Sequence, residues 1–224
     1  MSTPPDPEAL DFIRAHLTLR PAPARPDIRL YQAHAGSRLS RLDELTISGA
    51  LNPYWAYPWA GGGGLARFLL DQPETAAGRR VLDLGTGGGL VAIAAMKAGA
   101  REVVAADVDP YALAALSLNA AANKVEVEGV LGDLTRGEPP EVDLVAIGDL
   151  FYDQDTAAQV TAFLDRCLDA GAEVLVGDPK RAHLPHARLR ELAEYAVPDF
   201  GDGASNAKTM SWVFAFEEAA PCSP

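Results

Sequence analysis

The sequence is poor in the residues that several classes of protein require. Its two cysteines, Cys167 and Cys222, match neither a disulfide framework nor a metal-ligand spacing. Only 19 Lys and Arg stand against 31 Asp and Glu, which gives a formal net charge of −12. A protein that holds a nucleic-acid backbone needs clustered basic side chains. We therefore expect no nucleic-acid partner and no metal centre.

Long apolar runs are also missing. The longest, GLVAIAAMKAGA at 89–100, is too short to cross a bilayer and carries Lys97. The first residues, MSTPPDPEALDF, show no basic start followed by an apolar stretch, so we expect no secretory signal. These patterns predict a cytoplasmic protein that does not enter membranes. The hydrophobic share of 48% is enough to build a full core.

Strand and helix patterns alternate from Arg80 onward. Apolar runs of strand length occur at 81–84, 103–107, 125–130, 143–149, 173–178 and 210–216. Helical patterns are expected at 90–99, 110–123, 155–168 and 183–195. Near-continuous apolar strands are typical of parallel sheets covered on both faces. We therefore predict an α/β fold with a doubly wound, mostly parallel sheet, whose last strand inserts antiparallel beside residues 197–200.

The first 79 residues follow a different pattern and read as an appendage to this core. They contain a short amphipathic helix at 9–17, a proline-rich connector at 20–27, a strand within IRLYQA, and an aromatic segment before four glycines and a helix. The predicted organisation is therefore an N-terminal appendage at 1–79, a core at 80–218 and a loose tail at 219–224.

A glycine-rich turn, DLGTGGG at 83–89, follows the first strand of the core. Glycines between a strand and a helix let a ligand approach the backbone closely. A dinucleotide fingerprint would place a pyrophosphate there, but the carboxylate of Asp83 disfavours one. S-adenosylmethionine carries an amine and a sulfonium and no phosphate. We expect Asp83, Gly85, Thr86 and Gly87 to bind that cofactor; a tight turn without a ligand is the alternative.

Further acids stand at the ends of the next two strands. Asp107 ends the second strand, where a carboxylate can accept hydrogen bonds from ribose hydroxyls. Asp109 is the nearby alternative, but its place before Pro110 favours capping of the next helix. Asp133 either holds its own turn or accepts a hydrogen bond from the adenine amino group. Its position in line with Asp83 and Asp107 favours the adenine contact.

The fourth strand leads into GDLFYD at 148–153. Open α/β sheets bind ligands at the carboxyl ends of their strands. We therefore expect Asp149 to face the same cleft as the three preceding acids. The alternative is that Asp149 only caps the loop after the strand.

Three stretches together resemble one known group: NPYWAYPWAGG (52–62), GDLFYD (148–153) and GDPKR (177–181). With the glycine turn and the strand-end acids, the chain is similar to the seven-stranded S-adenosylmethionine-dependent methyltransferases. It most resembles the lysine methyltransferases that act on the β subunit of electron transfer flavoprotein. The resemblance implies a seven-stranded Rossmann-like sheet, S-adenosylmethionine as cofactor and a lysine of that subunit as acceptor. It includes an Asp-x-x-Tyr pattern, Asp149 to Tyr152, and departs at Lys180, where a glycine is expected.

The residues after Asp149 indicate the chemistry of the acceptor. Enzymes that methylate a planar amide or base nitrogen typically have two prolines here, but this chain has Leu150 and Phe151. A flexible amine needs an apolar tunnel, an aromatic wall and one acid. We expect Asp149, also adjoining the cofactor, and Tyr152 to be catalytic. Leu150, Phe151, Tyr152 and Trp59 are expected to line the tunnel, with Trp59 also near the cofactor; structural packing is the alternative for Trp59.

Other functions stay open. The acceptor could be an amine of a ribosomal protein or of a small molecule. The chain could also be a non-catalytic adaptor that retains a cofactor site, although the intact glycine turn and strand-end acids disfavour this. A nicotinamide-dependent dehydrogenase is disfavoured by Asp83 ahead of the glycines.

Overall fold

The computed structural model describes residues 3–39, 52–199 and 208–219. Its centre is a seven-stranded sheet in the order β5-β4-β3-β6-β7-β9-β8. Five strands run parallel, and β9 runs antiparallel between β7 and β8. The predicted doubly wound, mostly parallel sheet is therefore confirmed. The strands are β3 (Arg80–Leu84), β4 (Glu102–Asp107), β5 (Glu128–Leu131), β6 (Leu144–Gly148), β7 (Glu173–Asp178), β8 (Leu189–Val197) and β9 (Thr209–Phe216).

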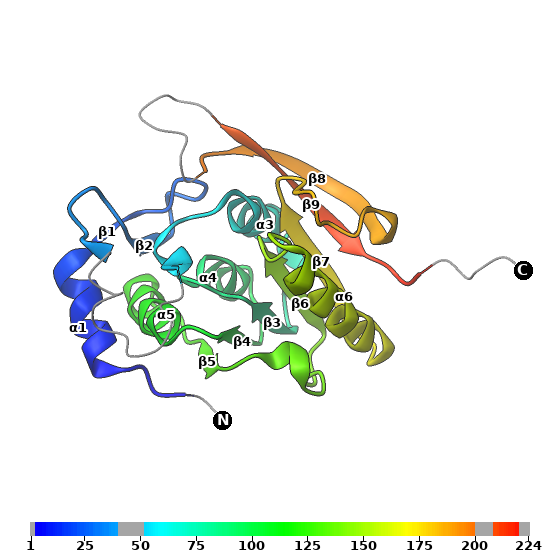
Figure 1. The fold of residues 1–224 in the computed structure, drawn as a ribbon, viewed down its shortest axis with the longest axis horizontal. Coiled ribbons are helices and arrows are strands. Elements are labelled where there is room, and N and C mark those ends of the chain that lie inside the picture. Colours follow the sequence, from blue (N-terminus) through cyan, green and yellow to red (C-terminus); the bar gives the residue numbers. More distant parts are fainter. Residues whose placement is uncertain (1–2, 40–51, 200–207, 220–224) are drawn as a thin grey trace, which may run out of the picture.

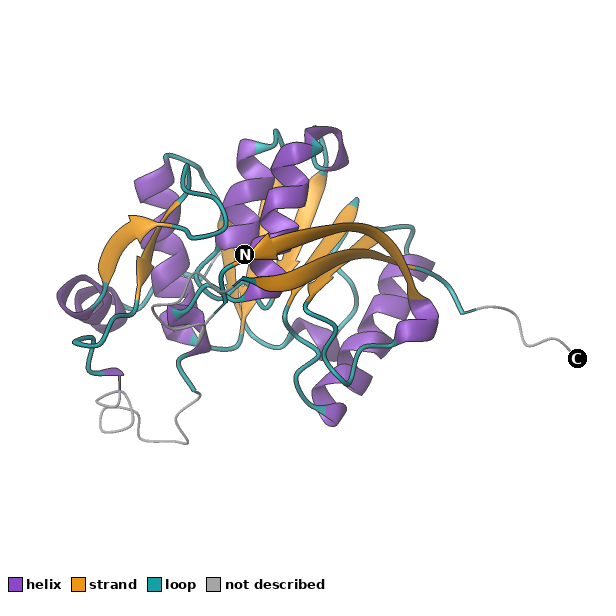
Figure 2. Cartoon of the chain, turned by 90° about the horizontal axis from the view of Figure 1, so that it is seen from above, coloured by secondary structure: helices purple, strands orange, loops and turns teal. Residues whose placement is uncertain are grey.

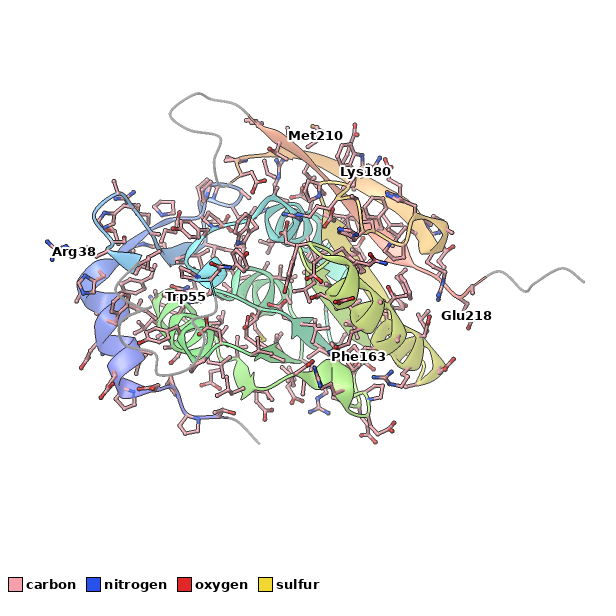
Figure 3. All side chains as sticks on the ribbon, in the orientation of Figure 1. Arg38, Trp55, Phe163, Lys180, Met210 and Glu218 are labelled. Atoms are coloured by element: carbon pink, nitrogen blue, oxygen red, sulfur yellow. The ribbon has the colours of Figure 1, made fainter. Side chains whose placement is uncertain are left out.

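Helices cover both faces of the sheet (Figures 1 and 2). On one face, α3 (Ala60–Asp71), α4 (Leu90–Lys97) and α5 (Pro110–Asn123) enclose one apolar core. On the other, α6 (Gln154–Asp169) packs on the second core. Phe163 of α6, labelled in Figure 3, is fully buried there, and burial of such a side chain contributes about 1.5–3 kcal/mol. The described residues also contain short 3-10 turns: η2 (Tyr54–Ala56), η3 (Pro73–Thr75), η4 (Leu134–Arg136) and η5 (His186–Arg188).

The prediction of a helix at 183–195 is wrong. Only a short turn, η5, forms there, and residues 189–197 form β8, which pairs along its length with β9. The segment is rich in helix-forming residues, but the open edge of β9 outweighs that weak local preference. A bulge between Glu191 and Ala193 interrupts the alternation of inward-facing and outward-facing side chains that would mark a strand in the sequence. Only Ala193, Tyr195 and Val197 follow it, with their side chains toward the core. The expected neighbour of the last strand at 197–200 is thus replaced by 189–197, and Phe200 lies outside the described residues.

The N-terminal segment packs beside α5 (Figure 1). It begins with α1 (Pro7–His16), which confirms the expected helix and is capped by the Asp6 carboxylate accepting from the Glu8 N–H. The expected strand in IRLYQA is β2 (Arg29–Gln32). Its partner β1 (Thr18–Pro21) occupies the start of the stretch predicted as a connector. Most of the predicted tail, including Cys222, lies outside the described residues.

The four consecutive glycines lie inside the first turns of α3, rather than before it as the sequence suggested. Glycine costs about 1 kcal/mol relative to alanine in a helix, so a packing reason is required. A Cβ on Gly61 would collide with the carbonyl oxygen of Gly177, and one on Gly148 would lie 2.8 Å from the Gly62 Cα. Because the helix and the two strands all have glycine at these contacts, the start of α3 packs directly on the ends of β6 and β7.

Among the described residues, no helix is both long and apolar enough to cross a bilayer.

Candidate active site

A cavity opens at the carboxyl ends of β3 and β6, where the strand order of the sheet reverses direction. It encloses about 570 Å³, counting the part open to solvent. Ligands of open α/β sheets bind at this kind of position. Its walls come from four parts of the chain: residues 30–32 of β2, residues 54–59, the glycine turn and the end of β6. A second hollow of about 640 Å³ lies over α6 near His183, but none of the strand-end acids lines it.

The glycine turn after β3 is held in a shape that side chains disfavour. Gly85 and Gly87 have φ values of +70° and +52°, in the left-handed region. A Cβ on Gly85 would also lie 2.6 Å from the Leu150 side chain. The turn and the GDLFYD loop therefore touch, so that the predicted cofactor-binding and acceptor-binding segments are neighbours.

Asp83 lies at the floor of this cavity and is almost fully buried. Its Oδ2 accepts hydrogen bonds from the Thr86 hydroxyl at 2.6 Å and from the Ala92 N–H at 3.0 Å. Burial raises the pKa of Asp83 to about 7, which outweighs these two hydrogen bonds. Because burial disfavours the charged form of Asp83, a cation that binds beside this carboxylate would stabilise its ionised form. The side chain of Thr86 is thus tied to Asp83, while the turn remains at the cavity wall.

Asp107 is tied to the same turn. Its Oδ2 accepts from the Gly87 N–H at 2.9 Å and its Oδ1 from the Asp109 N–H at 3.0 Å. Each oxygen keeps a second lone pair for another donor. Asp109 caps α5 by accepting from the Tyr111 N–H at 2.8 Å, which confirms its predicted capping role.

Asp133 fills its hydrogen-bonding capacity with donors from its own loop and from α6. Its Oδ1 accepts from the backbone and hydroxyl of Thr135. Its Oδ2 accepts from Arg136 Nε at 2.8 Å and Gln159 Nε2 at 2.9 Å. The structure therefore favours the turn-holding role of Asp133 over the adenine contact that its position in the sequence predicts.

Asp149 belongs to a buried ion-pair network that the sequence did not reveal. Arg181 Nη1 lies 2.5 Å from Asp149 Oδ1 and 3.0 Å from Asp178 Oδ2. Asp149 Oδ2 also accepts from the Gly62 N–H at 2.6 Å, at the start of α3. Burial raises the pKa of Asp149 to about 6, and the charge of Arg181 opposes the rise. With both carboxylates ionised, the three side chains carry one net negative charge.

The missed members, Asp178 and Arg181, could have been found in the sequence. Asp178 ends the strand next to β6 in the sheet, and Arg181 follows it by one tight turn within GDPKR. Lys180, which stands where the resemblance expected glycine, takes a left-handed φ of +67°. Its ammonium pairs with Glu191 at 3.1 Å and lies 4.1 Å from the centre of the Trp212 ring, beside the β8–β9 hairpin (Figure 3).

Two of the four residues expected to line the substrate tunnel, Phe151 and Leu150, pack against other parts of the protein. Phe151 is fully buried in the core beneath α6, so its assignment to the substrate tunnel is wrong. It points to the core because the chain leaves β6 through a left-handed residue, Asp149, with φ +62°. Leu150 packs against the glycine turn.

Aromatic side chains of residues 54–59 line the cavity, and Tyr152 lies beside one of them, Tyr54, without lining the cavity itself. Trp59 lines it and donates from Nε1 to the Tyr54 carbonyl at 2.8 Å. Tyr152 is half exposed, and its ring centre lies 6.1 Å from that of Tyr54, a residue that the sequence reading had not singled out. Trp55 is buried, stacks on Tyr111 with ring centres 5.9 Å apart and also lines the cavity.

Known proteins similar to this chain include methyltransferases. Residues 66–146 match the family model for ribosomal protein L11 methyltransferase. Among solved structures, TrmN from Thermus thermophilus superposes with a TM-score of 0.51 and 24% identity, over 80% of this chain and 53% of that one. The ribosomal protein L11 methylase of Lactobacillus delbrueckii subsp. bulgaricus gives a TM-score of 0.50 and 20% identity, over 69% and 77%. These likenesses support the fold alone.

Curated relatives are closer in sequence. The electron transfer flavoprotein beta subunit lysine methyltransferase of Rattus norvegicus is 40% identical over 171 residues, which is 74% of this chain and 67% of the relative. The Xenopus laevis relative is 38% identical over 213 residues, which is 92% of this chain and 86% of the relative. The match to the Danio rerio relative spans only 60% of that protein.

The sheet order, the glycine turn and these matches make the chain a class I methyltransferase, an enzyme class whose methyl donor is S-adenosylmethionine. Within that class, the chain belongs to the electron transfer flavoprotein beta subunit lysine methyltransferase family.

Proposed function

We propose that this enzyme transfers methyl groups from S-adenosylmethionine to lysine side chains of the β subunit of an electron transfer flavoprotein. The relative from Xenopus laevis, matched over 92% of this chain, supports this substrate. The excess negative charge of Asp149, Arg181 and Asp178 beside the cavity supports an amine acceptor, because a lysine ammonium would neutralise it.

The cavity and the acid beside it fit the proposed cofactor. Asp83, which lines the cavity, would hold its amino group, and the glycine turn allows close approach of the backbone. Asp107 does not line the cavity itself but is bound to the Gly87 N–H of the turn, from where it would hold the ribose hydroxyls. S-adenosylmethionine, when bound, supplies an electrophilic methyl group. Every remaining requirement falls to the protein, which must bring a neutral amine nitrogen into line with that methyl.

Asp149 would orient the amine rather than act as a strong base. Free lysine has a pKa of about 10.4, and a lone carboxylate would stabilise its ammonium form. The positive charge of Arg181 stabilises the ionised form of Asp149 and so lowers the affinity of that carboxylate for the lysine proton. Both Asp149 oxygens already accept one hydrogen bond but keep a lone pair for the amine. Most of the rate gain would then come from positioning.

A ribosomal-protein amine is the second candidate, because the L11 methyltransferase model matches residues 66–146. That match covers Asp83, Asp107 and the glycine turn, but it ends before Asp149. It therefore supports the cofactor side of the site and says nothing of the acceptor side.

The two candidates can be separated by offering both substrates. Purified flavoprotein β subunit and purified L11 would each be incubated with the enzyme and methyl-labelled S-adenosylmethionine, followed by mass spectrometry of the modified peptides. We expect methylated lysine in the β subunit and little label in L11. Label in L11 alone would replace our proposal with the second candidate.

A further inference from the structure

A fully buried asparagine on α5 connects the N-terminal segment to the glycine turn. The Asn119 Oδ1 accepts a hydrogen bond from the Tyr31 N–H of β2 at 2.7 Å. Its Nδ2 donates to the Gly88 carbonyl, also at 2.7 Å. Both ends of one side-chain amide are therefore in use, and both partners belong to residues that line the cavity.

The second asparagine of α5 shows what Asn119 does differently. Asn123, one helical turn further on, accepts from the Arg29 N–H at 2.9 Å and donates to the Arg29 carbonyl at 2.6 Å. It satisfies the free edge of β2 as a neighbouring strand would. Asn119 accepts from the same edge but gives its donor to the glycine turn instead.

The N-terminal strand is also part of the cavity wall. Leu30, Tyr31 and Gln32 line the same cavity as Gly85–Gly88. The turn approaches the Asn119 side chain closely, since a Cβ on Gly88 would lie 3.4 Å from its Nδ2. A buried amide left without partners costs free energy, so this contact restrains a turn that its glycines leave flexible.

We propose that Asn119 is a positioning residue of the cofactor site and that, through it, β2 and the glycine turn act as one unit. The N-terminal segment then serves cofactor binding, not only the stability of the fold. This inference rests on the cofactor site proposed above and is independent of the acceptor, so it stands even if the flavoprotein subunit is not the substrate.

Two alanine variants form a matched test. Asn119→Ala and Asn123→Ala both remove side-chain contacts from β2, but only the first releases Gly88. Affinity for S-adenosylmethionine would be measured by calorimetry, with thermal melts of the unliganded proteins. We expect both melting temperatures to fall, and cofactor affinity to fall about tenfold in Asn119→Ala and to stay near wild type in Asn123→Ala. Equal affinities in the two variants would overturn the proposal.

A measurement on the wild-type enzyme remains informative even if Asn119→Ala does not fold. Amide hydrogen exchange would be compared with and without S-adenosylmethionine. If the two segments act as one unit, cofactor binding slows exchange at the Tyr31 amide as well as at the amides of the turn. Protection confined to the turn, with Tyr31 unchanged, would contradict the coupling.

Discussion

The guanidinium of Arg181 lies 2.5 Å from the carboxylate of Asp149 and also pairs with Asp178, whose side chain is completely buried. The acid that begins the Asp-x-x-Tyr pattern is therefore not a free carboxylate. Its charge and its orientation depend on a residue 32 positions further along the chain. This dependence gives the first prediction.

Replacing Arg181 with methionine should raise the pKa of Asp149 further above its present value of about 6, because two buried carboxylates would lose their shared cation. An acid that must be ionised loses function as the pH falls through its pKa. The acidic limb of the activity profile should thus move to higher pH, by roughly 1–3 units. Methyl transfer would be measured across pH 5.5–9.

Arg188→Met is the matched control for this variant, because Arg188 pairs with Asp165 of α6, outside the cavity. Its pH profile should follow the wild type. If Arg181→Met lowers the melting temperature but leaves the shape of the profile unchanged, Arg181 only stabilises the fold.

The raised pKa of Asp83, about 7, predicts a pH-dependent affinity for S-adenosylmethionine. Below that value the unliganded carboxyl is protonated, and binding of a cationic amine must displace the proton. Affinity should therefore rise between pH 5.5 and 7.5, by up to about tenfold per unit at the acidic end. Calorimetry over this range would show the rise in the wild type and a flatter dependence in Asp83→Asn. An equal slope in both proteins would remove Asp83 from the amine site.

The sequence predicted the sheet from Arg80 onward because those strands are apolar and bounded by glycines and acids. It could not predict β8, because the residues of that strand prefer a helix and only the open edge of β9 makes them a strand. The places of Asp83 in β3 and of Asp107 at the end of β4 were predictable, because each acid follows an apolar run. Their cofactor contacts stay predictions. Arg181 could have been singled out, because it follows the strand-end acid Asp178 by one tight turn. Its pairing with Asp149 and the role of Asn119 could not, because both depend on contacts between elements distant in sequence.

Gly85→Ala should impair cofactor binding more than a strained backbone alone explains. Gly85 and Gly78 have nearly equal φ values, +70° and +73°, so alanine at either costs a similar backbone strain. Only at Gly85 would the new Cβ meet Leu150, at 2.6 Å, whereas Gly78 has open space around it. We expect both variants to lose stability and only Gly85→Ala to lose cofactor affinity. Comparable affinities would place the turn outside the site.

Asp107, which ends β4, and Asp109, which caps α5, should respond differently to truncation. Asp107→Ala removes the acceptor that holds Gly87, and with it the proposed ribose contact, so affinity should fall at least about tenfold. Asp109→Ala removes a helix cap, which costs about 1 kcal/mol of stability. Its affinity should change little. A larger loss of affinity in Asp109→Ala would reverse the two assignments.

The most direct test of the acceptor site is the Asp149→Asn variant, assayed with the flavoprotein β subunit. Methyl transfer per folded molecule would be measured beside cofactor affinity and thermal melting. The amide keeps the size of the side chain but loses its charge and places a donor near the Gly62 N–H or Arg181. We predict a fall in turnover of about 100-fold from misplacement of the amine, with cofactor affinity largely retained. A variant that melts at lower temperature but methylates the β subunit at the wild-type rate would contradict the role of Asp149.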